Sequence, residues 1–169
     1  QRQMCIRDRD GSFKHVNICG KEYWGKNLLD KIDQLIRTAY FDEDDEEEKR
    51  FAMDYIWYLW CGPDAPSFDK DKMATFERYF IADKSLHKET KGYYYALRNK
   101  EEICDRILEE FGVTGQHTHI INGHVPVKTI KGEQPMKAGG KLLVIDGGFS
   151  KAYQPETGIA GYTLVYHSH

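Results

Sequence analysis

The chain has 169 residues, of which 40% are hydrophobic and 13% aromatic, and its formal net charge is −3. This composition predicts one compact folded domain with a hydrophobic core and argues against an intrinsically disordered chain. The slightly acidic balance argues against a nucleic-acid-binding surface, and no run of about 18 apolar residues is present that would span a membrane. Its four cysteines include no CxxC pair, which favours reduced thiols and a cytoplasmic location over a disulfide framework.

The first part of the chain is expected to be helical. Apolar residues at helical spacing predict a helix that begins near Trp24 and ends near Tyr40. A second helix is predicted over residues 47–60, and its many apolar residues suggest burial on most sides. An amphipathic helix is predicted over residues 100–110, with Gly112 in the position that commonly follows a helix C-cap.

Seven consecutive acidic residues, Asp42–Glu48, lie between the first two predicted helices. We interpret them as a solvated loop that leads into a helix N-terminus, where negative charge interacts favourably with the helix dipole. A cation site is the less favoured alternative, because the acids lack the alternating spacing of a calcium-binding loop.

The composition changes near residue 111. Residues 1–110 contain 19 Lys or Arg and 24 Asp or Glu, whereas residues 111–169 contain 5 and 3, together with 10 of the 15 glycines and 5 of the 7 histidines. Short β-branched and apolar runs in this second part predict strands over residues 117–122, 141–146 and 161–167, the last preceded by a turn. The fold class expected is therefore α+β, with a helical first part followed by strands.

The densest polar cluster surrounds His124, which follows the first of these predicted strands between Gly123 and Pro126. Loops at the ends of buried strands commonly carry functional groups in α/β folds. A histidine held there could present a neutral ring nitrogen to a metal ion. No partner ligands are spaced as in HExxH or a zinc knuckle, so a hydrogen-bonded structural histidine is the alternative interpretation.

Charged residues after His124 offer further candidates. The lysines of this region are Lys128, Lys131, Lys137 and Lys141. Lys128 lies four residues beyond His124 and could reach the same cleft, where an ammonium group beside a metal suits a phosphate substrate. Asp146 could orient a histidine or could simply cap the end of its strand.

Longer stretches resemble a known family. The segment Ile121–Lys128 resembles the Gly-His-x-Pro motif of the calcineurin-like metallophosphoesterases. From Asp10 to His169 the chain is similar to the bacterial class III fructose-1,6-bisphosphatases. The matching stretches include Leu59–Pro63, Lys72–Phe80 and Gly140–Tyr153.

The resemblance implies a four-layer α/β/β/α fold with a two-metal centre, holding manganese or a similar ion, that activates a water molecule. It also implies hydrolysis of the 1-phosphate of fructose 1,6-bisphosphate, a small sugar phosphate, to fructose 6-phosphate in gluconeogenesis. His124 matches the metal-binding histidine of the motif. From charge and position, Lys128, Arg78 and Lys72 are expected to contact the substrate phosphates.

Several family motifs do not occur in the chain, among them Asp-x-His, Gly-Asp-x-x-Asp-Arg and Gly-Asn-His-Asp. We therefore expect an internal fragment whose other metal ligands lie upstream, and which is inactive alone because one ligand does not hold two metals. Residues 1–9 resemble translated sequencing-adapter sequence and are expected to be a non-native leader; a divergent native tail is the alternative. Residues 10–110 and 111–169 would then be the helical and strand-rich parts of the phosphatase domain.

Two other functions stay open from the sequence. One is a metallophosphoesterase that acts on nucleotides or phosphoproteins, and the other is a non-catalytic binding module. The sequence is also compatible with a homo-oligomer.

Overall fold

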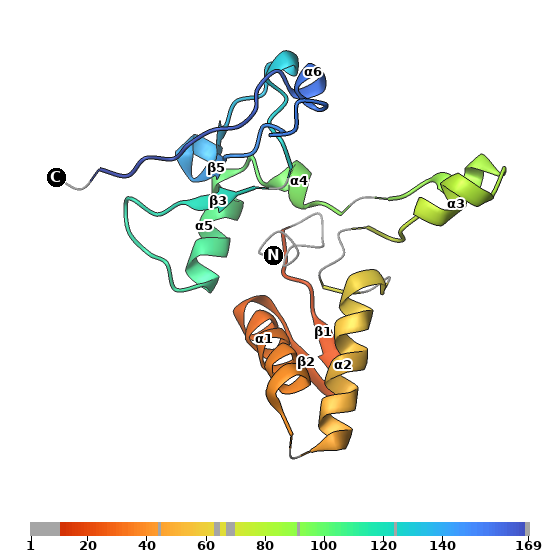
Figure 1. Ribbon diagram of the computed structural model, residues 1–169. Coiled ribbons are helices and arrows are strands. Elements are labelled where there is room, and N and C mark those ends of the chain that lie inside the picture. The colour runs from red at the N-terminus through yellow and green to blue at the C-terminus, as the bar shows by residue number, and fades with distance from the viewer. Residues whose placement is uncertain are drawn as a thin grey trace. The chain divides into compact units, whose positions relative to one another are not determined.

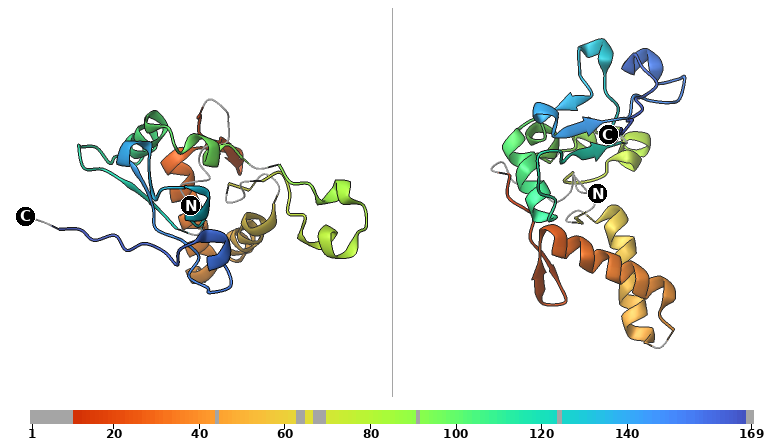
Figure 2. Two further views of the ribbon diagram at one scale, coloured as in Figure 1. Left: turned by 90° about the horizontal axis from the view of Figure 1, so that it is seen from above. Right: turned by 90° about the vertical axis from the view of Figure 1, so that its left-hand side faces the viewer.

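The computed structural model describes residues 11–43, 45–62, 65–66, 70–90, 92–123 and 125–167, with Cys61 described only as a helix residue. The chain mixes helices and strands, as predicted for the α+β class, and divides into two compact units, Gln1–Tyr95 and Ala96–His169. Figures 1 and 2 show the elements of both units. Within the described residues, no helix combines the length and the hydrophobicity needed to cross a membrane.

The elements assigned before residue 96 are β1 (Val16–Ile18), β2 (Lys21–Tyr23), α1 (Gly25–Phe41), α2 (Glu46–Cys61), α3 (Thr75–Phe80), η2 (Lys84–His87) and α4 (Tyr94–Leu97), which extends across the boundary. The second unit contains α5 (Glu101–Glu110), β3 (Ile120–Asn122), η3 (Thr129–Lys131), β4 (Met136–Lys137), η4 (Ala138–Gly140), β5 (Leu142–Val144) and α6 (Gln154–Thr157).

A small hydrophobic core holds the start of the first unit together. Strands β1 and β2 form an antiparallel hairpin, and Figure 1 shows α1 and α2 side by side next to it. Ile18 of the hairpin, Leu28 and Leu35 of α1, and Ala52 of α2 are buried in one cluster. Leu28 and Leu35 are seven residues apart, so two turns of α1 present them to the same neighbours. Both helices were predicted correctly to within about two residues.

The acidic run behaves as a loop and a helix start. Asp45 is the N-cap of α2, and its side chain accepts hydrogen bonds from the backbone amides of Glu47 and Glu48 at 3.0 and 2.9 Å. Glu46, Glu47 and Glu48 form the first turn of α2, where the helix dipole favours negative charge. The predicted interpretation of this run is confirmed for its described residues.

The expectation that α2 is buried on most sides was wrong. Only the side facing α1 and the hairpin is covered, whereas Met53, Trp57 and Trp60 are 56%, 66% and 61% exposed. An apolar sequence does not show which side of a helix has a partner, because burial depends on what the rest of the fold provides.

A buried carboxylate organises the segment that contains α3 and η2. The Glu89 side chain is only 8% exposed. Its carboxylate accepts hydrogen bonds from Lys70 Nζ at 2.7 Å and from the backbone amide of Ala74 at 2.9 Å. Arg78 Nη2 lies 3.3 Å away. The hydrogen bond from Lys70, followed by that from Ala74, lowers the pKa of Glu89 below its ordinary value. The ionised carboxylate thus joins three positions of this segment.

The second unit is built around a three-stranded sheet in the order β3-β5-β4. Strands β3 and β5 are parallel and β4 is antiparallel to β5. The views in Figures 1 and 2 agree that α5 lies beside this sheet, and Lys141 Nζ forms an ion pair with Asp105 of α5 at 2.8 Å. The predicted helix over residues 100–110 is confirmed, and it lies in the same unit as the strands.

Helix α5 ends in a Schellman motif, as the placement of Gly112 predicted. The Val113 amide donates to the Leu108 carbonyl and the Gly112 amide to the Glu109 carbonyl, both at 2.9 Å. Gly112 has φ +67°, a left-handed conformation that costs a glycine little and other residues more.

The predicted strands are shorter than expected. Of residues 117–122 only Ile120–Asn122 form a strand, and of residues 141–146 only Leu142–Val144. The strand predicted over residues 161–167 was wrong among its described residues: Gly161 forms an isolated bridge with Asp146, and residues 163–167 are exposed. The turn expected at Pro155–Gly158 is instead the short helix α6 with a left-handed Gly158.

Replacing the α2 cap tests the role of the acidic run. Asp45→Ala removes the oxygen that accepts from Glu47 and Glu48, and we expect the free energy of unfolding to fall by about 1 kcal/mol. Asp45→Asn keeps a carbonyl oxygen in the same place and should lose much less. Urea denaturation followed by circular dichroism measures both, and equal losses in the two variants would contradict the capping role.

Replacing Glu89 tests the buried carboxylate. Glu89→Gln removes the charge that Lys70 and Arg78 approach, and we expect the hydrogen-exchange protection of the Ala74 amide to fall about tenfold, since hydrogen bonds to charged groups are the stronger ones. Glu43→Gln, at an exposed acid of the same unit, should leave it unchanged.

The same carboxylate predicts a pH dependence. Because the pKa of Glu89 is lowered in the folded chain, its stabilising contribution is complete above the unfolded value of about 4.3 and is lost as the pH falls through the folded pKa. The difference in protection between the wild-type chain and Glu89→Gln should therefore shrink below about pH 4. A difference that stays constant down to pH 2 would rule out Glu89 as the titrating group.

Candidate functional site

The candidate site lies where the parallel strands β3 and β5 end. The register pairs Ile120 with Leu142 and Asn122 with Val144, and the Ile145 amide continues the ladder by donating to the Asn122 carbonyl at 2.9 Å. Because the strands are parallel, the segments that follow β3 and β5 leave the sheet at the same edge. This edge is where α/β folds place functional loops.

His124 lies outside the described residues, so the structure does not test its predicted role as a metal ligand. The residues on either side of it are described. Asn122 ends β3 and is buried, and the Val125 amide donates to the Gly123 carbonyl at 2.8 Å. The sequence neighbours of His124 thus belong to the edge where β3 ends.

Asp146 joins the loop after β5 to the loop after β3. Its backbone carbonyl accepts a hydrogen bond from the Val127 amide at 2.7 Å. Its side chain accepts from the Gly148 amide at 2.9 Å. Of the two roles expected for Asp146, the structure shows the cap at the end of its strand.

A second connection joins the same two loops further out. The Thr129 hydroxyl donates to the carbonyl of Thr157 in α6 at 2.8 Å. Thr157 is 2% exposed, and its own hydroxyl bonds to the Tyr153 and Ile159 carbonyls at 3.2 and 3.0 Å. Gly158 lies so close that a Cβ atom there would meet Thr129 Oγ1 at 2.5 Å. The loop after β3 is thereby fixed against α6.

Lys128 lies between these two connections and is half-buried. Its backbone amide donates to Glu133 Oε2 at 3.1 Å, while the Glu133 amide donates back to the Lys128 carbonyl at 3.3 Å. Among the described residues, no carboxylate lies within ion-pair distance of its ammonium group. The backbone of Lys128 is therefore fixed by its hydrogen bonds with Glu133.

Lys72 and Arg78 lie in the first unit and are bound within it. Lys72 Nζ donates to the Leu86 carbonyl at 2.9 Å. Arg78 Nη2 lies 3.3 Å from the Glu89 carboxylate and 3.4 Å from the His87 carbonyl. Arg78 thus connects α3, and Lys72 connects the residues just before α3, to the segment around η2. Their predicted contact with substrate phosphate stays a prediction.

A metal centre needs several ligands brought together. In the part of the chain that the structure describes, no three His, Cys, Asp or Glu side chains form a group that could hold a metal ion. A nucleophilic role for Cys104 is not supported either, since burial raises the pKa of its thiol to about 11 and Sγ donates to the Arg98 carbonyl at 3.4 Å. The described residues therefore do not by themselves fit the expected two-metal centre.

Sequence reasoning missed the residues that position Lys128. Thr129 and Thr157 are 28 residues apart, and nothing in the sequence signals that their loops meet. Glu133 does not match a capping box either, because that pattern places the acid three residues after the cap, whereas Glu133 lies five residues after Lys128.

Comparisons with known proteins give similarities over nearly the whole chain. A protein of Bacteroides fragilis named fructose-1,6-bisphosphatase class 3 is 99% identical over 162 residues, which are 96% of this chain and 24% of that protein. Proteins of the same name from Bacteroides thetaiotaomicron and Clostridium tetani are 80% and 61% identical, with the same coverage. The chain therefore spans about a quarter of the length of these relatives. No solved structure gives a significant match.

A protein family matches nearly the whole chain. The sequence matches the family described as Firmicute fructose-1,6-bisphosphatase over residues 4–169, so the match includes both structural units. It also includes the loops at the ends of β3 and β5 and all three described candidates, Lys72, Arg78 and Lys128. On this match, the chain belongs to the Firmicute fructose-1,6-bisphosphatase family.

Proposed function

We propose that the full-length protein to which this chain corresponds hydrolyses the 1-phosphate of fructose 1,6-bisphosphate to fructose 6-phosphate, a step of gluconeogenesis in the cytoplasm. The observation that carries the proposal is the 99% identity over 162 residues to a protein named fructose-1,6-bisphosphatase class 3. So few differences leave little room for a different substrate in this part of the protein.

The proposed fold of the full-length protein is the four-layer α/β/β/α metallophosphoesterase fold. The parallel pair β3 and β5, with functional loops at one edge, supports this proposal. Residues 10–110 and 111–169 would be two parts of that single phosphatase domain.

The proposed cofactor is manganese in a two-metal centre, which would supply an activated water for hydrolysis. His124 is the proposed ligand from this chain, and the other ligands would come from the rest of the protein. Because the described residues do not hold a metal by themselves, we assign no catalytic step to them. We further propose that the 169-residue chain alone is inactive.

Lys128 is the residue of this chain best placed to bind a substrate phosphate. Its backbone is fixed by Glu133, the loop that carries it is fixed to α6 by Thr129, and no described carboxylate neutralises its charge. An ammonium group held in this way can form a charge-assisted hydrogen bond to a phosphate oxygen without first breaking an ion pair.

The proposed activity predicts metal-dependent turnover by the full-length protein only. Metal-free full-length protein should gain fructose 1,6-bisphosphatase activity on addition of manganese, and the 169-residue chain should show none. His124→Ala in the full-length protein should lower activity more than about 100-fold, since even residues that only support metal ligands cost 10- to 100-fold. His117→Ala, at an exposed histidine of the loop before β3, should have little effect.

Release of phosphate from fructose 1,6-bisphosphate, nucleotides and phosphopeptides measures these outcomes and the alternatives together. Preference for a nucleotide or a phosphopeptide would overturn the proposed substrate. Turnover by the 169-residue chain would overturn its proposed inactivity. A fully active His124→Ala variant would overturn the proposed ligand.

The proposed role of Lys128 predicts a substrate-binding defect. Lys128→Ala in the full-length protein should raise KM for fructose 1,6-bisphosphate about ten- to a hundredfold, the value of one charged hydrogen bond, and change kcat less. Thr129→Val, which removes the hydroxyl bound to Thr157, should raise KM in the same direction, and Thr129→Ser should restore it. Steady-state kinetics measures these effects.

Lys131→Ala provides the matched control, because Lys131 is an exposed lysine of the same loop and should leave both constants near their wild-type values. Equal rises in KM for Lys128→Ala and Lys131→Ala would point to a general electrostatic effect rather than a specific contact. A fall in kcat with KM unchanged would contradict a role in substrate binding.

A further inference from the structure

The α1/α2 pair of the first unit presents apolar side chains on two sides. One side forms the core with the β1–β2 hairpin, through Leu28, Leu35 and Ala52. On the other, Met53 and Trp60 of α2 are more than half exposed. A helix pair that only had to cover its own hairpin would need a single apolar side.

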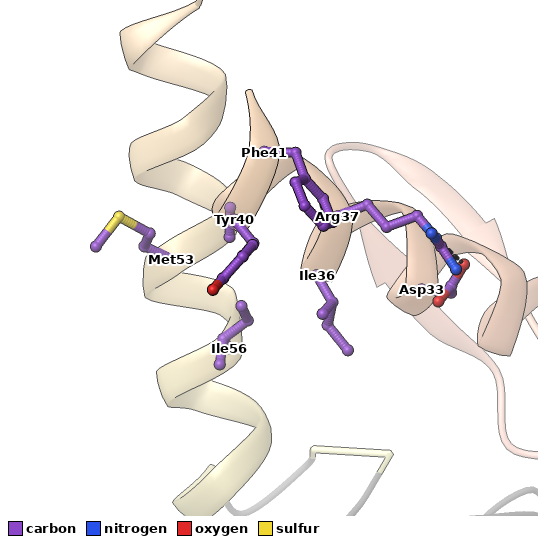
Figure 3. A pocket seen from close by; sticks show the side chains of 8 residues that line it. Asp33, Ile36, Arg37, Tyr40, Phe41, Met53 and Ile56 are labelled. Carbon is purple, nitrogen blue, oxygen red and sulfur yellow. Dashed lines mark hydrogen bonds and ion pairs between the residues drawn. The ribbon is translucent and has the colours of Figure 1, made fainter. Parts of the chain in front are cut away.

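A groove continues this exposed side between the two helices. It has a volume of about 480 Å³ and is lined by Ile36, Tyr40 and Phe41 of α1 and by Met53 and Ile56 of α2, among others. Figure 3 shows Tyr40 between the helices next to Ile56. We call the groove together with Trp57 and Trp60 the apolar face.

Charge at the edge of the groove is already neutralised. Arg37 Nε donates to Asp33 Oδ2 at 2.7 Å, one turn apart on α1, as the dashed line in Figure 3 marks. This pairing raises the pKa of Arg37 above its ordinary value, chiefly through the hydrogen bond to Asp33. A ligand for this groove therefore needs apolar side chains rather than a charge of either sign.

Contiguous exposed apolar surface of this kind marks a contact site for another protein segment. We propose that the apolar face binds an apolar segment of the same polypeptide, from the part of the full-length protein that lies outside these 169 residues. This inference does not depend on the proposed function.

The length of the relatives supports an intramolecular occupant. The chain corresponds to 24% of each of them, so roughly three quarters of the polypeptide lies outside it. A segment joined covalently to the face is present at a high effective concentration and pays less entropy than a separate molecule. A second copy is less suited, because a two-fold contact centred on the groove would place two concave surfaces against each other.

A photoreactive residue on the apolar face tests the proposal in the full-length protein. Met53 is replaced by benzoylphenylalanine, and the matched control replaces Asp54, the exposed next residue, which points about 100° further around α2. After irradiation, gel electrophoresis and peptide mass spectrometry identify the partner. We expect at least five times more crosslinking from position 53, with monomer mobility and a crosslinked peptide from outside the 169 residues.

Other outcomes overturn the proposal. A crosslinked product of twice the monomer mass from position 53 would identify a second copy as the occupant. Equal yields from positions 53 and 54, or crosslinks confined to these 169 residues, would show that no outside segment covers the face. If the variant at position 53 does not fold by circular dichroism, the same substitution at Trp60, aromatic for aromatic, carries the test with the same outcomes.

Discussion

The parallel pairing of β3 with β5 is the constraint on which the geometry of the second unit depends. Its register places Asn122 beside Val144, so the chains that follow the two strands begin at the same edge. Two connections then join the loops, the Val127 amide to the Asp146 carbonyl and the Thr129 hydroxyl to the Thr157 carbonyl. A slip of one residue in the register would move the alternating side chains of β3 to opposite faces and separate both pairs.

Positive charge alone does not identify a phosphate contact in this chain. Arg78 and Lys70 stabilise a nearly buried carboxylate, and Lys72 binds a carbonyl of a neighbouring loop. If Arg78 turned to a substrate, the Glu89 carboxylate would lose one of its partners. This would cost free energy, because the carboxylate is poorly solvated. Among the described residues, no carboxylate depends on the ammonium group of Lys128. Backbone and hydroxyl groups hold its loop in place instead.

The first unit combines a small hydrophobic core with an exposed apolar helix surface. Among the described residues, the cluster at the hairpin and the first two helices contains four buried residues with a few partly buried ones around them, while large aromatic side chains of α2 stay in contact with water. The acidic first turn of α2 and its Asp45 cap satisfy the helix start locally. Local interactions can therefore specify the start of a helix whose outer surface stays exposed in this chain.

The sequence by itself determined the elements that depend on local interactions. The spacing of apolar residues predicted α1, α2 and α5, the acidic run predicted the start of α2, and Gly112 predicted the end of α5, because helix periodicity and caps involve neighbours within about five residues. The resemblance of its motifs also identified the family. Only the tertiary structure decided which side of α2 is buried, how short the strands are, and that the side chains of Lys72 and Arg78 are bound within the chain. Those properties depend on contacts between residues far apart in the chain, such as Thr129 with Thr157 and Arg78 with Glu89, and no local pattern encodes which distant groups will meet.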